Sequence, residues 1–276
     1  MTKPEPSLNR NLADLLAVMS RLRDPATGCN WDLRQTYQSI APSTIEEAYE
    51  VVDAIEREDY QHLREELGDL LFQVIFHSQL AAEEQRFSFA DVVADLANKL
   101  VRRHPHVFPE GTLDSRRPAG SAPDETAIAR MWEEIKEEER AAKGAVGLLD
   151  DLPLALPAMT RAAKMQKRAS HCGFDWVHID GVIAQVDEEL HELQDAIARQ
   201  SASDIAEEAG DLLFSAVNLT RHLGLDAESV LREGNRKFER RFRYIESRLA
   251  EEGSSPEKAD VDYMERLWHE AKKAGL

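Results

Sequence analysis

Cysteine, long hydrophobic runs and positive charge are all scarce in this sequence. Two cysteines in 276 residues, Cys29 and Cys172, are too few for a disulfide framework or a four-cysteine zinc site. We expect each to be a small buried side chain. No stretch is apolar for long enough to cross a bilayer, and the first residues lack the hydrophobic stretch of a secretory signal. These absences predict a cytoplasmic protein that has no membrane partner.

The shortage of positive charge limits the partners further. The chain has 34 lysine and arginine residues against 52 aspartates and glutamates, which gives a formal net charge of −18. Such a surface disfavours broad binding to a nucleic-acid polymer. A small anionic ligand stays compatible with it where metal ions or local basic residues receive that ligand. The hydrophobic share of 42% and the charged share of 31% are typical of a folded, helix-rich protein.

A duplicated acidic pattern organises the chain. Five acids recur at a constant shift of 142 (188 − 46): Glu46, Glu47, Glu50, Glu66 and Asp69 return as Glu188, Glu189, Glu192, Glu208 and Asp211. The residues around the second arm repeat too, with Gly68 to Phe72 matching Gly210 to Phe214. Glycines and prolines interrupt the helical pattern between Ala141 and Pro157. We therefore expect two modules, residues 1–148 and 149–276, joined by a linker.

Apolar residues follow a helical rhythm almost everywhere. Leu67, Leu70, Leu71, Val74 and Ile75 show the spacing of three and four that places side chains on one helical face. Strand-like alternation is nearly absent from the sequence. The pattern predicts an all-α fold, built as a tandem repeat of two helical bundles of four or five helices each.

The spacing of the acids suggests metal binding. Glu46, Glu47 and Glu50 share one face of a helix, and so do Glu66 and Asp69. Like charges at this spacing oppose a helix by roughly 0.2–0.5 kcal/mol per pair unless a cation lies between them. Mg²⁺ suits such a site because it binds a few carboxylates together with substrate phosphates, and Mn²⁺ is a substitute. Two neighbouring ions can share the four acids.

A solvated face is the usual explanation for a single glutamate-rich helix. Solvated acids need no fixed register, whereas these five keep their identity and spacing in two copies that differ at most nearby positions. The pattern therefore favours a task shared by both copies. The alternative to an enzyme is a non-catalytic, metal-binding helical module that regulates or binds another protein through its negative charge.

The acids, the segment Phe174-Asp175-Trp176 and the residues Lys237, Phe238, Arg240, Arg241 and Phe242 resemble the MazG nucleoside triphosphate pyrophosphohydrolases over nearly the whole chain. The resemblance implies an all-α homodimer that depends on Mg²⁺. It also implies hydrolysis of a nucleoside triphosphate to the monophosphate and pyrophosphate, by attack of a metal-activated water on the linkage between the α and β phosphates. The role it suggests is house-cleaning or control of the nucleotide pool.

The resemblance gives roles to the acids. It assigns metal binding to four acids of each copy: Glu189, Glu192, Glu208 and Asp211 in the second, and Glu47, Glu50, Glu66 and Asp69 in the first. Glu188 or Glu189 is left to accept a proton from the attacking water as the catalytic base. Both motifs are intact, but the second copy resembles the family pattern more closely, so we expect it to be the working one.

A basic and aromatic group follows the acids in each copy. We assign the second-copy group to the triphosphate and the nucleotide: Lys237, Arg240, Arg241, Trp268 and Lys272. The first copy repeats it as Lys99, Arg102, Arg103, Trp132 and Lys136. Ordinary pairing with Glu233 and Glu239, and packing of Trp268 on the core, are the structural alternatives.

Three further features carry simpler expectations. Phe174 and Trp176 are expected to pack in the core, and His104 and His106 to be exposed in a loop, since they lack a third metal ligand. Asp204 lies four residues before Glu208, where some relatives of the resembled family have a basic residue. A phosphate contact at that position is therefore in doubt.

Overall fold

The computed structural model describes residues 10–120, 123–142, 144 and 147–276. Within these ranges the chain is helical and has no strand, which confirms the all-α prediction. Close packing divides it into two compact units, residues 1–135 and 136–276. Residue 135 lies inside a helix, whereas the boundary predicted near residue 148 lies between two helices and stays a prediction. Residues 143, 145 and 146 of the expected linker are outside the described ranges.

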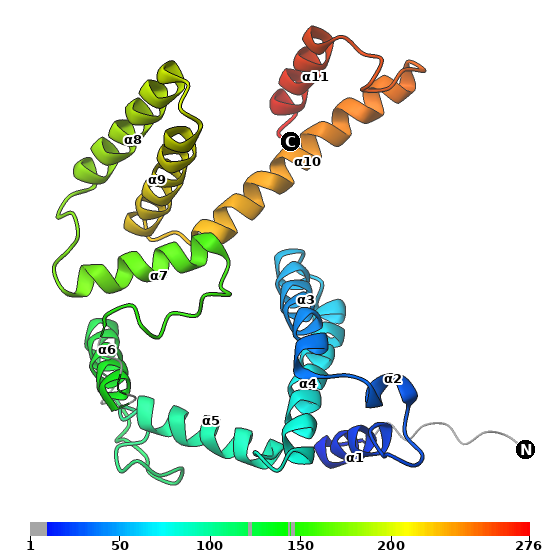
Figure 1. Ribbon diagram of the computed structural model, residues 1–276, viewed down its shortest axis with the longest axis vertical. Coiled ribbons are helices and arrows are strands. Elements are labelled where there is room, and N and C mark those ends of the chain that lie inside the picture. The colour runs from blue at the N-terminus through cyan, green and yellow to red at the C-terminus, as the bar shows by residue number, and fades with distance from the viewer. Residues whose placement is uncertain (1–9, 121–122, 143, 145–146) are drawn as a thin grey trace, which may run out of the picture. The chain divides into compact units, whose positions relative to one another are not determined.

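The first unit is built around a pair of long antiparallel helices (Figure 1). Its elements are α1 (Leu12–Leu22), the one-turn α2 (Asn30–Leu33), α3 (Tyr37–Glu56), α4 (Tyr60–Glu83) and α5 (Phe89–Arg103), and α6 (Glu125–Ala142) crosses the division at residue 135. Helices α3 and α1 both pack against α4. The core between them contains Met19, Ile40, Ile75, Phe76 and Leu80.

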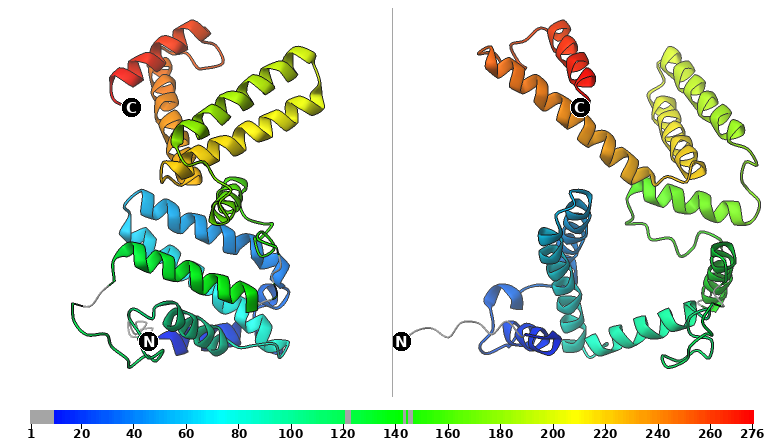
Figure 2. Two further views of the ribbon diagram at one scale, coloured as in Figure 1. Left: turned by 90° about the vertical axis from the view of Figure 1, so that its left-hand side faces the viewer. Right: turned by 180° about the vertical axis from the view of Figure 1, so that it is seen from behind.

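The second unit repeats this pairing. Its helices are α7 (Ala158–His171), α8 (Ile179–Arg199), α9 (Ala202–His222), α10 (Ala227–Glu251) and α11 (Val261–Lys273). Helices α8 and α9 lie side by side as an antiparallel pair in Figure 1 and Figure 2, and α7 packs on α9. Helix α10 contacts α7 and α9, and α11 folds back on α10 over Ile245, Leu249 and Leu267.

The two helix pairs begin at matching positions of the repeat. Helices α3 and α8 start at Tyr37 and Ile179, and α4 and α9 start at Tyr60 and Ala202, both 142 apart (179 − 37 and 202 − 60). The turns match as well, because Glu58 (φ 56°) and Gln200 (φ 55°) both adopt the left-handed conformation. This conformation costs a residue other than glycine about 1–2 kcal/mol, so the turn that aligns the two acidic helices is built the same way twice.

The second repeat is trimmed at the end of its helix pair. Helix α9 has 21 residues where α4 has 24. The three missing residues account for most of the fall in the repeat shift, from 142 at the acids to 138 (237 − 99) at the basic residues that follow. The acids therefore keep their register because the trimming lies beyond them.

The prediction of buried cysteines was wrong. Cys29 and Cys172 are both exposed. Each lies at a helix end, Cys29 as the residue before α2 and Cys172 as the residue after α7, where the chain turns away from the packed helical face.

Candidate functional site

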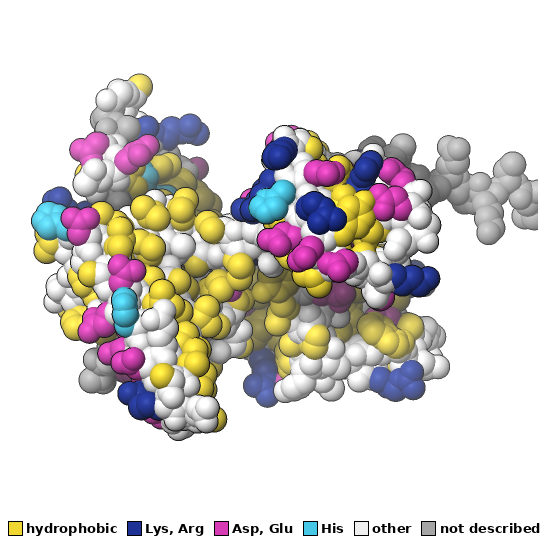
Figure 3. Space-filling model, turned by 90° about the horizontal axis from the view of Figure 1, so that it is seen from above, with side chains coloured by type: hydrophobic (Ala, Val, Ile, Leu, Met, Phe, Trp, Pro, Cys, Tyr) yellow, Lys and Arg dark blue, Asp and Glu magenta, His cyan; other side chains and the backbone are white. Residues whose placement is uncertain are grey.

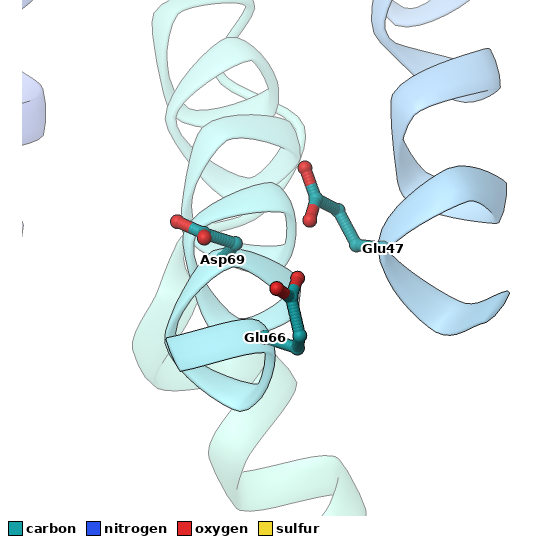
Figure 4. A group of neighbouring side chains, drawn as sticks. All are labelled: Glu47, Glu66 and Asp69. Atoms are coloured by element: carbon teal, nitrogen blue, oxygen red, sulfur yellow. The ribbon is translucent and has the colours of Figure 1, made fainter. Parts of the chain in front are cut away.

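The acids of the first repeat converge between α3 and α4. Glu47 of α3 points toward Glu66 and Asp69 of α4 in Figure 4, and one carboxylate oxygen of each lies within 4.8 Å of the others. Glu66 is 6% exposed, Glu47 is half-buried and Asp69 is exposed. Burial raises the pKa of the Glu66 carboxyl, and the neighbouring Glu50 raises it further. Glu50 therefore lies beside this group of three.

The acids of the second repeat form an equivalent group between α8 and α9. Glu189, Glu208 and Asp211 offer oxygens within 4.8 Å of one another. Burial raises the pKa of the Glu208 carboxyl, and the charges of Glu192 and Asp211 raise it further. Glu188 is exposed and lies outside this group. The four acids predicted as ligands are thus neighbours in each copy.

The donor set of both groups fits a hard divalent cation. Each group offers only carboxylate oxygens, closely spaced, and their mutual repulsion is what a cation would relieve. The groups differ in one neighbour. In the first group His62 Nε2 lies 3.1 Å from Glu66 Oε1, four residues further along α4. In the second group Asp204 stands at the corresponding position before Glu208, and its Oδ2 lies 3.8 Å from Arg199 Nη2. In the part of the chain that the structure describes, the second group has no ion pair of its own.

Glutamine side chains, which sequence reasoning missed, hold one acid of each group. In the first repeat Gln73 of α4 donates to Glu47 Oε1 across the helix pair at 3.4 Å. In the second, Gln185 donates to Glu189 Oε1 at 2.8 Å from one turn earlier on α8. The signal in the sequence was the spacing of four between Gln185 and Glu189, which places them on one helical face.

The predicted nucleotide-binding residues of the second copy lie on α10 and α11. Arg241 Nε donates to the carbonyl oxygen of Leu276 at 2.7 Å, and its guanidinium lies 5.4 Å from the centre of the Trp268 ring. Arg240 pairs with Glu233 at 3.1 Å, as the structural alternative supposed. Lys237 and Lys272 are exposed.

The structure brings Arg241 and Trp268 together but does not join this basic group to the acids of α8 and α9. Among the described residues no ion pair connects the two sets. The acids and the cationic groups therefore occupy separate helix pairs of the second unit.

The first-copy counterpart of Trp268 has different neighbours. The ring centres of His104 and His106 lie 5.4 Å and 6.4 Å from that of Trp132. The prediction of two exposed loop histidines was wrong, since both are half-buried against this tryptophan. Lys99 and Arg102 lie on α5, where Lys99 is half-buried and Arg102 exposed, and Arg103 ends that helix.

The segment Phe174-Asp175-Trp176 follows α7 and is not in the core. Phe174 is 77% exposed and Trp176 39% exposed, so the prediction of core packing was wrong. Asp175 instead fixes the segment, because its Oδ1 accepts hydrogen bonds from Arg221 at 2.6 Å and His222 at 2.8 Å. The hydrogen bond from Arg221 is the main reason that the pKa of Asp175 falls to about 2.

A family model describing the MazG nucleotide pyrophosphohydrolase domain matches the chain twice, over residues 35–108 and 179–245. The chain belongs to this family. Both MazG matches contain one acid group and the basic residues of the helix that follows. The tandem arrangement predicted from the repeat is thereby confirmed.

Full-length relatives agree with the family match. The chain is 48% identical to the nucleoside triphosphate pyrophosphohydrolase of Escherichia coli (strain K12) over 263 residues, which are 94% of this chain and 96% of that protein. It is 40% identical to the nucleoside triphosphate pyrophosphohydrolase/pyrophosphatase MazG of Thermotoga maritima over 259 residues, 94% of each. These names agree with the hydrolase activity that the MazG resemblance implied.

Proposed function

We propose that the chain hydrolyses nucleoside triphosphates to the monophosphate and pyrophosphate, with Mg²⁺ as the metal and Mn²⁺ as a substitute. The observation that carries this proposal is the group of three close carboxylates, with a fourth acid beside it, that lies between antiparallel helices inside both MazG matches. A triphosphate needs its charge neutralised before water can attack it, and such a group binds the cations that do this. The role that we propose for this hydrolysis is house-cleaning or control of the nucleotide pool.

In the second copy Glu189, Glu192, Glu208 and Asp211 hold the metal. Bound Mg²⁺ would neutralise phosphate charge and lower the pKa of water at the linkage between the α and β phosphates. Glu189 is better placed than Glu188 to accept the proton of that water, because Glu188 is exposed and outside the group. Its hydrogen bond from Gln185 occupies one oxygen and orients the other.

The cationic residues of α10 and α11 bind the substrate. Lys237, Arg240 and Arg241 meet the triphosphate, and Trp268 and Lys272 contact the nucleotide beside it. The Leu276 carbonyl and the Trp268 ring hold the Arg241 guanidinium in place, which reduces the entropy it loses on binding phosphate. We assign turnover to the second copy, where no histidine among the described residues pairs with the acid group.

We propose a homodimer because α8 carries an apolar stripe with the spacing of a helix–helix seam. Ile183, Val186, Leu190, Leu193 and Ile197 alternate in steps of three and four, and the first, third and fifth are exposed. Figure 3 shows hydrophobic side chains on the outside in the region where Figure 1 places α8 and α9. A second copy of the chain would cover this stripe, which light scattering tests through the molar mass in solution.

No helix in the described part of the chain is long and apolar enough to cross a membrane. We propose a cytoplasmic location on the separate ground that nucleoside triphosphates are made and used there.

Incubation with Mg²⁺ and a mixture of nucleoside triphosphates tests the activity. The expected product is pyrophosphate, measured separately from orthophosphate, and chelation of the metal should stop its release. Orthophosphate as the product, or no product with any nucleotide, would contradict the proposal and favour the non-catalytic alternative.

A further inference from the structure

A cavity of about 220 Å³ lies between α7, α9 and the segment that carries Phe174. Its walls are mainly apolar, with Met165, Phe174, Trp176 and Phe214 among them. Pockets that enclose a whole drug-sized ligand measure roughly 300–1,000 Å³, so this one suits a single flat heterocycle. Aromatic walls are the surfaces on which such rings stack.

Gln166 of α7 leaves a hydrogen-bond acceptor unused at this cavity. The side chain is 7% exposed and lines the cavity. Its Nε2 donates to the carbonyl oxygen of Phe214 at 2.8 Å, which fixes the orientation of the amide. The amide oxygen Oε1 is buried and has no partner. Because a buried acceptor without a partner is costly, the site is suited to a ligand with an N–H donor on its edge.

The cavity is aligned with the acid group along α9. Ser215 and Asn218 line it and lie four and seven residues after Asp211, on the same helical face. At 1.5 Å per residue they are about 6 Å and about 10 Å further along the axis. The sugar and α phosphate of a nucleotide bridge a gap of that order between its base and its β phosphate.

The first repeat fills the equivalent space with apolar side chains. At the shift of 142, Asn218 and His222 correspond to Phe76 and Leu80 (218 − 76 and 222 − 80). Phe76 is fully buried and packs with Met19 of α1 in the core of the first unit. The same helical face thus carries a closed core in one copy and a lined cavity in the other.

We infer that this cavity of the second copy binds the base of the nucleotide substrate, with Gln166 Oε1 accepting a hydrogen bond from an N–H group of the base. The inference rests on the proposed hydrolysis and adds the part of the site that reads the base. Gln166, Phe174 and Trp176 all precede residue 179, where the second family match begins. Base recognition therefore uses residues outside the segment that carries the acids.

Filling the cavity tests this assignment. Asn218→Phe introduces the ring that Phe76 provides at the equivalent position of the first repeat. The KM for ATP should rise about tenfold because the base loses its stacking surface. Inhibition by inorganic triphosphate, which has no base, should be unchanged, as should Mn²⁺ binding measured by calorimetry. Leu213→Phe, which adds the same ring to an exposed position of α9, is the control and should keep the original KM.

Gln166→Met supplies a second, milder variant that removes only the acceptor. The unmodified protein should prefer ATP to purine riboside triphosphate, whose base has no N–H donor, and the variant should lose that preference. An unchanged KM in Asn218→Phe together with an unchanged preference in Gln166→Met would overturn the inference while hydrolysis stands. No pyrophosphate from the unmodified protein would overturn the proposed function itself, and the inference with it.

Discussion

Gln185 Nε2 lies 2.8 Å from Glu189 Oε1, one turn away on α8, and holds the carboxylate that contributes to the second acid group. The first repeat reaches the same result from the opposite helix, with Gln73 of α4 at 3.4 Å from Glu47. The two copies therefore keep the acids and change the residue that orients them.

Removing the orienting amide should weaken metal binding without abolishing it. We expect Gln185→Leu to raise the Mg²⁺ concentration needed for half-maximal pyrophosphate release roughly tenfold, since residues that orient metal ligands contribute on this scale. Titration of Mg²⁺ against initial rate measures the change. Gln73→Leu is the matched control in the other repeat and should leave the titration unmoved. An unaltered Mg²⁺ requirement in Gln185→Leu would show that Glu189 needs no such support.

The ionised Asp175 should stabilise the fold through its bonds to Arg221 and His222. Its pKa in the folded protein is about 2 against an ordinary value of 3.8. A lowered pKa contributes stability that is present above pH 4 and is lost as pH falls towards 2. At pH 7 Asp175→Asn should reduce the free energy of unfolding by about 2 kcal/mol.

Denaturant unfolding at several pH values, followed by tryptophan fluorescence, measures this difference. The gap between the two proteins should narrow steadily below pH 4. A gap of constant size down to pH 2 would mean that the carboxylate charge is not what stabilises the segment.

The buried ring of Phe76 should matter for the stability of the first unit and not for turnover. Phe76→Ala leaves a cavity beside Met19 and should cost about 3–5 kcal/mol, whereas Phe87→Ala, at an exposed position, should cost at most about 0.5 kcal/mol. Calorimetric unfolding compares the two. We expect kcat/KM of the folded Phe76→Ala protein to match that of the unmodified chain. A large fall in kcat/KM would place the first repeat in the catalytic machinery.

The sequence predicted the fold and the acid groups well because both depend on periodic spacing. Glu47, Glu50, Glu66 and Asp69 keep their register in the second copy, and a constant shift along two helices makes them neighbours without further information. Helical periodicity alone also excluded strands.

The cavity and the exposed residues could not be read from spacing. Periodicity tells which side chains share a face but not whether another helix covers that face, so Phe174 and Trp176 were wrongly placed in the core. The change from Phe76 to Asn218 is a single letter in the sequence. Its consequence, a cavity with an unpartnered Gln166 oxygen, depends on how α7 packs on α9.

The most direct test of the account compares Glu192→Ala with Glu50→Ala, the same change in the two repeats, by pyrophosphate release from Mg²⁺ and ATP. We predict that Glu192→Ala lowers kcat by about a hundredfold or more, on the scale of removing one group that stabilises transition-state charge. Glu50→Ala should retain almost all of the activity. Equal losses in the two variants would contradict the assignment of turnover to the second repeat.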